Sequence, residues 1–582
     1  MTHLLSQVIR SSLDEWVMEL SHADYHNHKV ELWTFHDQAT RARAQAQLRQ
    51  QGIEAFVYSA YKPLVHFCLE NVALIDRSAS RIEIRYPVHP EASEARFLLE
   101  AYPLGAMLRD KSVQFIADHT LMDHYQITEW DQDGEAQVYS VFAPNQLVQD
   151  ATGSQQWSPC AWLRVTAPDG TLIQNEARCG DYWQVFNTIM QTVTQHEWPE
   201  RAPYFERLEI DVQLPTNDDV LGYEHEVISL REALHEELYF SIQEWFKTRE
   251  GKTTNARDAQ PGQIVPKITR STDEHSHIEV RLSPYVTDNL SRQSEPLATA
   301  NHPLSIEQVT AELKALGGEP LYVATVTGRE VTAAYLAGKE KAVVVSGGQH
   351  ANETSGVVGA LRAAQVLCQQ DGVNLVVSPL ENPDGYALHQ EFIQSNPHHM
   401  HHAARYTALG DDLEYRSVEP IYEKGIRHQA RQVSGAQLHI NLHGYPSHEW
   451  TRPFSGYVPQ GFEMWTIPKG FFLIIRHADT EQWQAYAEQF IEQVTLELQH
   501  CHAVMAMNRK QIALYEQHAG ETGFRMINGY PCLISAVENP DFPLQLITEY
   551  PDETIYGEDF IAGHSIQMET VLAAYRVHQS LG

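Results

Sequence analysis

His350 and Glu353 stand three residues apart in the segment Gly347-Gly-Gln-His-Ala-Asn-Glu353, directly after a predicted buried strand. A strand-to-helix turn here directs both side chains into one crevice at the carboxyl edge of a sheet, where ligands bind in open α/β folds. Histidine nitrogen and glutamate oxygen are both zinc ligands, and a hydrolytic zinc site takes three protein ligands and a water. The segment therefore predicts two ligands of a zinc site.

A third ligand is expected at the end of a neighbouring strand. The segment Gln437-Leu-His-Ile-Asn-Leu-His-Gly-Tyr445 contains His439 and His443, which are four residues apart and so share one strand face. His443 is preferred because it stands at the carboxyl end of the strand, where Gly444 then frees the chain to turn. We therefore predict a single Zn²⁺ bound by three side chains: His350, Glu353 and His443.

The elements that must position these residues alternate between strand and helix after residue 300. Apolar runs predict strands at 341–346, 375–379, 438–442, 471–475 and 544–547, and helices at 354–370, 481–509 and 559–578. Continuous apolar strands are typical of a sheet covered on both faces. We expect residues 301–582 to form an α/β domain with a mainly parallel mixed sheet flanked by helices.

The first 300 residues predict a separate, strand-rich α+β region of unassigned role. This region could comprise two subdomains. Strands are expected at 28–35, 52–58, 81–86 and 137–142, a helix at 38–51, and a long amphipathic helix at 226–247. On that helix His235, Glu236 and Glu237 are expected on a solvated face. The polar segment 248–305 predicts connecting chain with one strand at 277–282, and we place the domain boundary within it.

Four segments of the second half resemble the zinc carboxypeptidases of the M14 family, over roughly residues 305–580. In the family's order they are Val326-Thr-Gly-Arg-Glu-Val331, the Gly-Gly-x-His-Ala-x-Glu motif, Asn382-Pro-Asp-Gly-Tyr386 and His443-Gly-Tyr445. The resemblance implies a metal-activated water that hydrolyses a peptide or peptide-like amide bond, with a glutamate as general base. It also implies zinc on the three predicted ligands.

The resemblance suggests further catalytic residues. Glu549 closes a late apolar strand before the last helix, which matches the family's order for the base, and Glu538 is the alternative. Arg405 lies in the region where the family carries the arginine that stabilises the oxyanion. The family's mobile tyrosine corresponds to either Tyr515 or Tyr530. The nearby cluster 398–402, which holds four histidines, predicts a loop lining a polar cleft rather than a second metal site.

One segment departs from the family. Carboxypeptidases there have Gly-x-Asp-x-Asn-Arg, whose Asn and Arg bind the substrate's terminal carboxylate, whereas this chain has Glu414 and Tyr415, with Arg416 one residue later. Two interpretations are open for the substrate-binding residues. Arg416 could take over through a one-residue shift, because guanidinium suits a carboxylate. Otherwise Glu414 would repel a carboxylate and favour an amine or amide.

Composition excludes some function classes. With 42 Lys+Arg against 76 Asp+Glu the formal net charge is −34, which argues against nucleic acid or an anionic membrane as a partner. No apolar run approaches the roughly 18 residues that span a bilayer. Six cysteines without a C-x-x-C motif predict reduced thiols, so a cytoplasmic location is expected.

These observations predict a metallocarboxypeptidase-like zinc hydrolase acting on a peptide or small amide. One alternative is an N-acyl amino acid deacylase of the aspartoacylase or succinylglutamate desuccinylase type, which shares the ligand pattern. The other is an inactive binding protein on the same fold. The long N-terminal region and the Asn-Pro-Asp-Gly-Tyr motif favour the peptidase, and the complete ligand set argues against an inactive protein.

Overall fold

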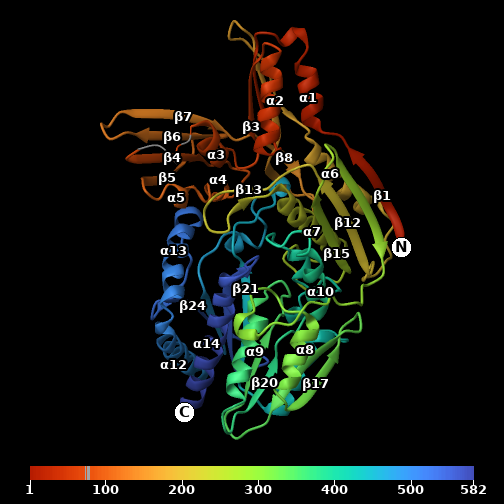
Figure 1. The fold of residues 1–582 in the computed structure, drawn as a ribbon, viewed down its shortest axis with the longest axis vertical. Helices are drawn as coiled ribbons and strands as arrows, with labels where there is room; N and C mark the ends of the chain where they lie inside the picture. Colours follow the sequence, from red (N-terminus) through yellow and green to blue (C-terminus); the bar gives the residue numbers. More distant parts are fainter. Residues whose placement is uncertain (73, 75–78, 582) are drawn as a thin grey trace.

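The computed structural model describes residues 1–72, 74 and 79–581. The N-terminal half lies above the C-terminal half in Figure 1, and the two share an extensive contact. One hydrophobic core contains side chains of both halves, among them Phe240 of the first half and Trp450 and Phe454 of the second. The N-terminal half is thus packed onto the C-terminal half rather than tethered beside it. The division at residue 300 stays a prediction.

The C-terminal half is built on a nine-stranded mixed sheet. In spatial order the strands are β17 (Glu319–Ala324), β18 (Glu330–Leu336), β20 (Leu375–Ser378), β19 (Val343–Gly347), β21 (Leu438–Pro446), β25 (Leu544–Glu553), β22 (Phe472–Ala478), β24 (Tyr530–Val537) and β23 (Arg525–Ile527). The four strands from β20 to β25 are parallel neighbours, as are β22 and β24, and the other four pairings are antiparallel. The predicted mixed sheet is confirmed, with parallel pairing concentrated at its centre.

The two faces of this sheet have different chemistry, and β21 shows it best. Leu438, Ile440 and Leu442 point into the apolar core under the helices α9 and α14. Because side chains alternate along a strand, His439, Asn441 and His443 point to the opposite face. The helices of this half are α8 (Ile306–Ala315), α9 (Ser355–Leu367), α10 (Pro383–Phe392), α11 (Gly425–Ser434), α12 (Glu481–Glu497), α13 (His502–Ala519) and α14 (Glu558–Ser580).

One predicted helix is in fact two. The segment expected as a single helix over 481–509 forms α12 and α13, which are separated by a 3₁₀ turn at Leu498–His500 and by Cys501 with φ −81° and ψ 61°. The second helix continues to Ala519, ten residues beyond the expected end. Its far end contacts α4 and α5 of the N-terminal half, so tertiary packing extends it.

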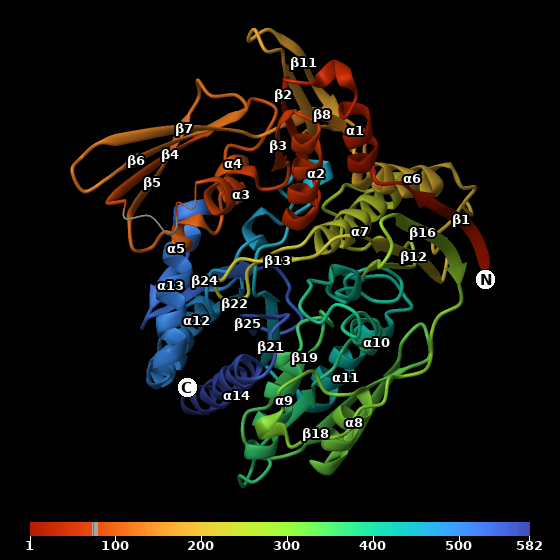
Figure 2. The ribbon, with the colours of Figure 1, turned by 45° about the horizontal axis from the view of Figure 1, so that its top comes forward.

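In the part of the N-terminal half that the structure describes, the strands form three four-stranded sheets and two short ribbons. Figure 2 shows their arrangement from a second direction. The first sheet has the order β1 (Thr2–Ile9), β16 (Ser276–Ser283), β12 (Arg207–Leu214) and β15 (Gln263–Arg270). The second has the order β11 (Leu172–Arg178), β10 (Ala161–Thr166), β2 (Lys29–Thr34) and β3 (Glu54–Ser59). The third has the order β5 (Ser112–Asp118), β4 (Arg81–Pro87), β6 (His124–Trp130) and β7 (Ala136–Phe142). The ribbons pair β8 (Asn145–Gln149) with β9 (Gln155–Pro159), and β13 (Asp219–Val220) with β14 (Val227–Ile228). The helices are α1 (Ser12–Leu20), α2 (Gln38–Gln50), α3 (Pro63–His66), α4 (Arg96–Glu100), α5 (Leu104–Met107), α6 (Asp181–Gln195) and α7 (Leu230–Arg249). The strand-rich α+β prediction is confirmed.

The segment expected as connecting chain holds an unpredicted strand, β15. Pro266 interrupts its apolar pattern and removes a backbone donor, which argues against a central strand. The structure places β15 at the edge of its sheet, where such a proline is tolerated. The polar segment is therefore partly folded, and the chain leaves the N-terminal sheet only after Ser283.

Helix α7 corrects the prediction of a solvated face. His235 is 3% exposed, and Glu236 and Glu237 are fully buried. In both views α7 lies between the N-terminal strands and α10 (Figures 1 and 2), and most of its side chains are buried. Its charges pair instead with groups of the C-terminal half, for example Glu244 with Arg452 at 2.7 Å. Sequence periodicity could not reveal a partner that lies about two hundred residues away.

Two smaller expectations concern environment. No helix in the described part of the chain is long and apolar enough to cross a membrane. The six cysteines are free thiols: Cys68, Cys160 and Cys532 are buried, Cys368 and Cys501 are partly buried, and Cys179 is exposed.

Candidate active site

The three predicted ligands come from two neighbouring strands. β19 ends just before Gly348, and the following turn carries His350 and Glu353 to the start of α9. Gly348 has φ +61°, and a Cβ there would lie 2.8 Å from a Leu380 methyl carbon, so this turn requires glycine. β21 runs parallel to β19, and its carboxyl end brings His443 to the same edge of the sheet.

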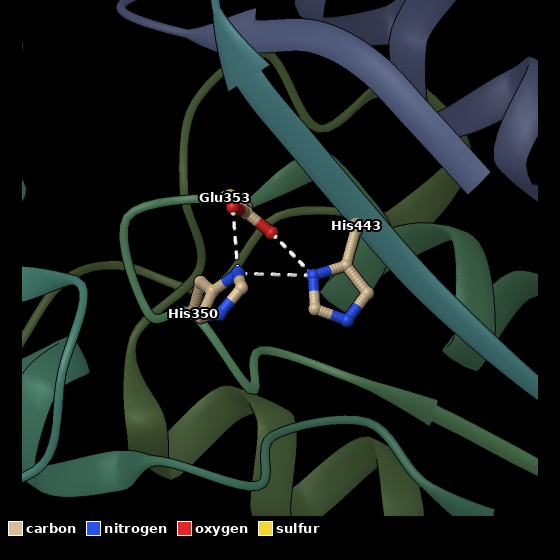
Figure 3. Close-up of side chains that lie close together, drawn as sticks. All are labelled: His350, Glu353 and His443. Carbon is tan, nitrogen blue, oxygen red and sulfur yellow. Dashed lines mark hydrogen bonds and ion pairs between the residues drawn. The ribbon is translucent and has the colours of Figure 1, made fainter. Parts of the chain in front are cut away.

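The ligand atoms converge on one point (Figure 3). Glu353 Oε1 lies 2.9 Å from His350 Nδ1, Glu353 Oε2 lies 2.8 Å from His443 Nδ1, and the two Nδ1 atoms are 3.0 Å apart. In a tetrahedral zinc site with Zn–N near 2.0–2.1 Å, donor atoms are about 3.3 Å apart. Among the residues that the structure describes, this is the one cluster of His, Cys, Asp or Glu found to suit a metal ion. The donor set and its spacing therefore fit one zinc ion.

Two further contacts orient the ligands. His350 Nε2 lies 3.2 Å from Asp412 Oδ2, and an N–H donated there leaves Nδ1 with a lone pair for a metal. The backbone N–H of Gly444 donates to Glu353 Oε2 at 3.0 Å. Sequence reasoning missed Asp412, although it lies in the segment that departs from the family. The contact between this buried carboxylate and the ligand histidine is visible only in the folded structure, so the sequence alone could not reveal it.

The charge on Glu353 is stabilised by its surroundings. Burial alone would raise its pKa, but His350, Arg405 and His443 together lower the pKa well below the usual value. Burial also lowers the pKa of His443. The carboxylate is thus held ionised and His443 is held neutral, which are the protonation states that metal binding needs.

Glu549 lies beside His443. The two residues are register partners on the parallel strands β21 and β25, so their side chains share one sheet face. Glu549 is 8% exposed and lines the same cavity as both histidine ligands. Burial, followed by the negative charge of Glu353, raises the pKa of Glu549 well above its ordinary value.

Glu538, the alternative base, lies elsewhere. It is exposed and follows β24, whose direction is opposite to that of β25. The carboxyl ends of these two strands therefore lie at opposite edges of the sheet. Only Glu549 of the two glutamates faces the cavity.

Arg405 also lines the cavity and is mostly buried. Its Nη1 donates to Glu353 Oε1 at 2.5 Å and lies 3.8 Å from Glu553 Oε1. The guanidinium therefore stands next to the candidate metal position, and its role in stabilising developing negative charge stays a prediction.

Arg416 does not reach the cavity, which corrects its predicted role in binding a substrate carboxylate. Its side chain is buried and donates to Asp411 at 2.6 and 2.8 Å. It also pairs with Glu423. With two carboxylates already bound, the charge of this guanidinium is compensated within the protein.

Glu414 and Tyr415 do line the cavity. The Glu414 carboxylate pairs with Arg427, which in turn binds Glu381 at 2.9 Å. Its charge is therefore compensated within the protein, which removes the reason to expect that it repels a substrate carboxylate. Tyr415 is about half exposed.

Other aromatic and histidine predictions have mixed outcomes. Neither Tyr515 nor Tyr530 lines the cavity, and the Tyr530 hydroxyl donates to a backbone carbonyl in the core. From the cluster 398–402, His402 lines the cavity and its Nδ1 pairs with Glu236 of α7. The remaining cavity lining comes from both halves of the chain: Arg257, Gln349, Asn441, Tyr445, Pro446, Phe462, Trp465, Ile474, Arg476, Gln545 and Ile547.

A match to a protein family agrees with these features. Residues 303–447 match the family model described as zinc carboxypeptidase. No curated protein matches the chain. Solved structures similar to it include a metallo-carboxypeptidase from Burkholderia cenocepacia (15% identity, 53% of this chain and 76% of that one, TM-score 0.29). Others are a carboxypeptidase A from Helicoverpa armigera (10%, 65% and 99%, TM-score 0.33) and bovine thrombin-activatable fibrinolysis inhibitor (11%, 49% and 100%, TM-score 0.28).

The family match spans the segment that carries the three candidate ligands, Arg405 and Asp412. The resemblance to M14 zinc carboxypeptidases predicted from sequence motifs is confirmed over these residues.

Proposed function

We propose that this protein is a zinc-dependent hydrolase that cleaves a peptide or peptide-like amide bond in the manner of a carboxypeptidase. The observation that carries the proposal is the cluster of three metal-ligand side chains at the edge of one cavity, which His350 and His443 line together with Glu549 and Arg405. The zinc carboxypeptidase match over residues 303–447 supports the same reaction class.

In this proposal His350, Glu353 and His443 hold one zinc ion. When bound there, zinc supplies a water of lowered pKa and polarises the substrate carbonyl. Asp412 keeps His350 in the tautomer that presents Nδ1.

Glu549 is the proposed general base. Its carboxylate takes a proton from the attacking water and then delivers it to the nitrogen of the departing amine. The low-dielectric surroundings that raise its pKa make it a stronger base than an exposed glutamate. The Arg405 guanidinium stabilises the negative charge that develops on the carbonyl oxygen.

The test begins with metal analysis of the purified full-length protein, followed by a peptide panel with free and amidated C-termini and N-acyl amino acids, read by product mass. We expect about one zinc per chain, and His350→Ala or His443→Ala should remove it. Glu549→Gln should keep the zinc and lower turnover by about 10²–10⁴-fold. Glu538→Gln is the matched control and should retain full activity.

Full activity in Glu549→Gln would refute the assigned base. Cleavage confined to N-acyl amino acids would favour the deacylase alternative. Absence of zinc, with no measurable effect of His350→Ala, would leave only an inactive binding protein.

A cytoplasmic location is part of the proposal. Six free cysteines, three of them buried, suit a reducing compartment. Fractionation of cells that express the native protein tests this point.

A further inference from the structure

The cavity has an excess of unpaired positive charge. Three arginines line it: Arg257, Arg405 and Arg476. Arg405 is paired with Glu353, whereas Arg257 and Arg476 have no carboxylate partner in the part of the chain that the structure describes. Both unpaired side chains are partly buried.

The acidic residues of the cavity do not offset these two cations. Asp412 is bound by His350 and Gln349, and Glu414 is paired with Arg427. Glu549, the third lining carboxylate, stands at the candidate metal. Two guanidinium groups in a concave, partly water-excluded site create a field that attracts an anion.

Arg476 lies at the opposite end of the cavity floor from Glu549. The register partner of Arg476 is Gln545, which precedes Glu549 by four residues on β25 and therefore lies on the same sheet face. At about 3.3 Å per residue the two ends of the cavity floor are roughly 13 Å apart. Between them lie Ile474 and Ile547, which are themselves register partners. The floor thus offers an apolar stretch followed by a cation, which suits a methylene chain that ends in a carboxylate.

Arg257 approaches from the N-terminal half, on the loop between α7 and β15. Its guanidinium lies 5.6 Å from the ring centre of Tyr415 and 5.5 Å from that of Phe462. Its backbone carbonyl accepts the N–H of Asp412 at 2.8 Å, which ties the loop to the residue that orients His350. Arg257 therefore provides a cation beside Tyr415, where Arg416 does not reach.

We propose that the amine half of the substrate is an acidic amino acid, with Arg476 binding its side-chain carboxylate and Arg257 its α-carboxylate. This inference rests on the proposed amide hydrolysis and deepens it. Both a peptide ending in glutamate or aspartate and an N-acyl glutamate carry this end group. The N-terminal half acquires a role, because it contributes one of the two recognising residues.

The first test is binding, because it needs no turnover. Calorimetric titration of the full-length protein with L-glutamate and L-glutamine compares two ligands that differ only in the side-chain charge. We expect glutamate to bind about 10- to 100-fold more tightly, which is the strength of a charge-assisted hydrogen bond. Arg476→Gln should remove this preference, and Arg476→Lys should retain part of it. Arg257→Gln should lower the affinity for glutamate and for glutamine by the same factor, because both ligands have the α-carboxylate.

Arg431→Gln, on the exposed end of α11, is the control and should change neither affinity. Circular dichroism and thermal unfolding establish that each variant is folded. Equal affinity for glutamate and glutamine in the wild type, or an unchanged preference in folded Arg476→Gln, would overturn the inference.

The second test is turnover of matched peptides ending in glutamate or glutamine, and of N-acetyl-glutamate. We expect kcat/KM to favour the glutamate peptide by about the same 10- to 100-fold, and Arg476→Gln to lose this through KM. Equal hydrolysis of both peptides would refute the acidic preference and leave the proposed function intact. Selective glutamate binding without cleavage of any substrate would refute the proposed function and leave the two-arginine site standing. Cleavage of N-acetyl-glutamate but not of the peptide would identify the smaller substrate.

Discussion

The buried pair of His448 and Glu232 should make stability depend on pH in a defined window. His448 follows β21, and its Nε2 lies 2.7 Å from Glu232 Oε1 in the first turn of α7. Its Nδ1 lies 3.1 Å from Thr554 Oγ1. The pair is buried and joins the two halves of the chain.

The magnitude follows from the pKa of His448. Burial alone would lower this pKa, but Glu232, followed by Glu226 and Glu449, raises it from 6.5 to about 9. The folded state therefore holds a proton that the unfolded state releases between these values. The stabilisation is complete below about pH 6.5 and is lost as the pH rises through about 9. A difference of this size in pKa corresponds to about 3 kcal/mol.

The measurement compares the wild type with His448→Gln by urea unfolding at several pH values from 7 to 10. This range avoids most of the separate effect of Glu449, which has the same sign. Burial raises the pKa of Glu449 to about 7, so its contribution to stability is lost as the pH rises from about 4.5 to 7. The free energy of unfolding of the wild type should fall by about 2–3 kcal/mol more than that of the variant. His500→Gln, at an exposed position, should follow the wild type. Equal pH dependence in the wild type and His448→Gln would refute the reasoning.

Three further predictions concern Asp412, Gly444 and Arg452. Asp412→Asn should lower zinc affinity about 10- to 100-fold, because His350 loses the partner that sets its tautomer; a competing chelator measures this, and unchanged affinity would contradict it. Gly444→Ala should destabilise the protein by about 1–3 kcal/mol, because the added Cβ would lie 2.0 Å from Asp552 Oδ1; an unaltered urea midpoint would argue against this clash. Arg452→Met should cost about 3–5 kcal/mol in the same assay by leaving the α7 carboxylates buried without a cation, and a neutral effect would show that they take up protons instead.

Local pattern was sufficient to predict the metal-ligand cluster. His350 and Glu353 follow a strand that is buried throughout, and His443 lies near the carboxyl end of another, so parallel pairing of the two strands was enough to predict their meeting. The preference for Glu549 over Glu538 came from the family's order of elements, and its role as base stays a prediction. The zinc role of these residues stays a prediction.

The substrate end of the cavity depended on contacts that no local pattern encodes. Arg416 was a reasonable candidate from its sequence position, but Asp411 and Glu423 neutralise it. Arg257 lies in a polar segment without periodicity, more than 150 residues before Asp412, and only tertiary packing brings it to the cavity. Charge compensation of this kind is decided by three-dimensional neighbours.

The burial of α7 affects how the protein can fold during its synthesis on the ribosome. Glu237 and Glu244 of this helix require Arg452, which is synthesised about two hundred residues later. At a synthesis rate of roughly 5–20 residues per second, Arg452 is added on the order of tens of seconds after the helix. Until then the two carboxylates must stay hydrated or protonated, so the N-terminal half cannot reach its final packing while it is the only part made. Maturation of this half and completion of the cavity are therefore late events that occur together.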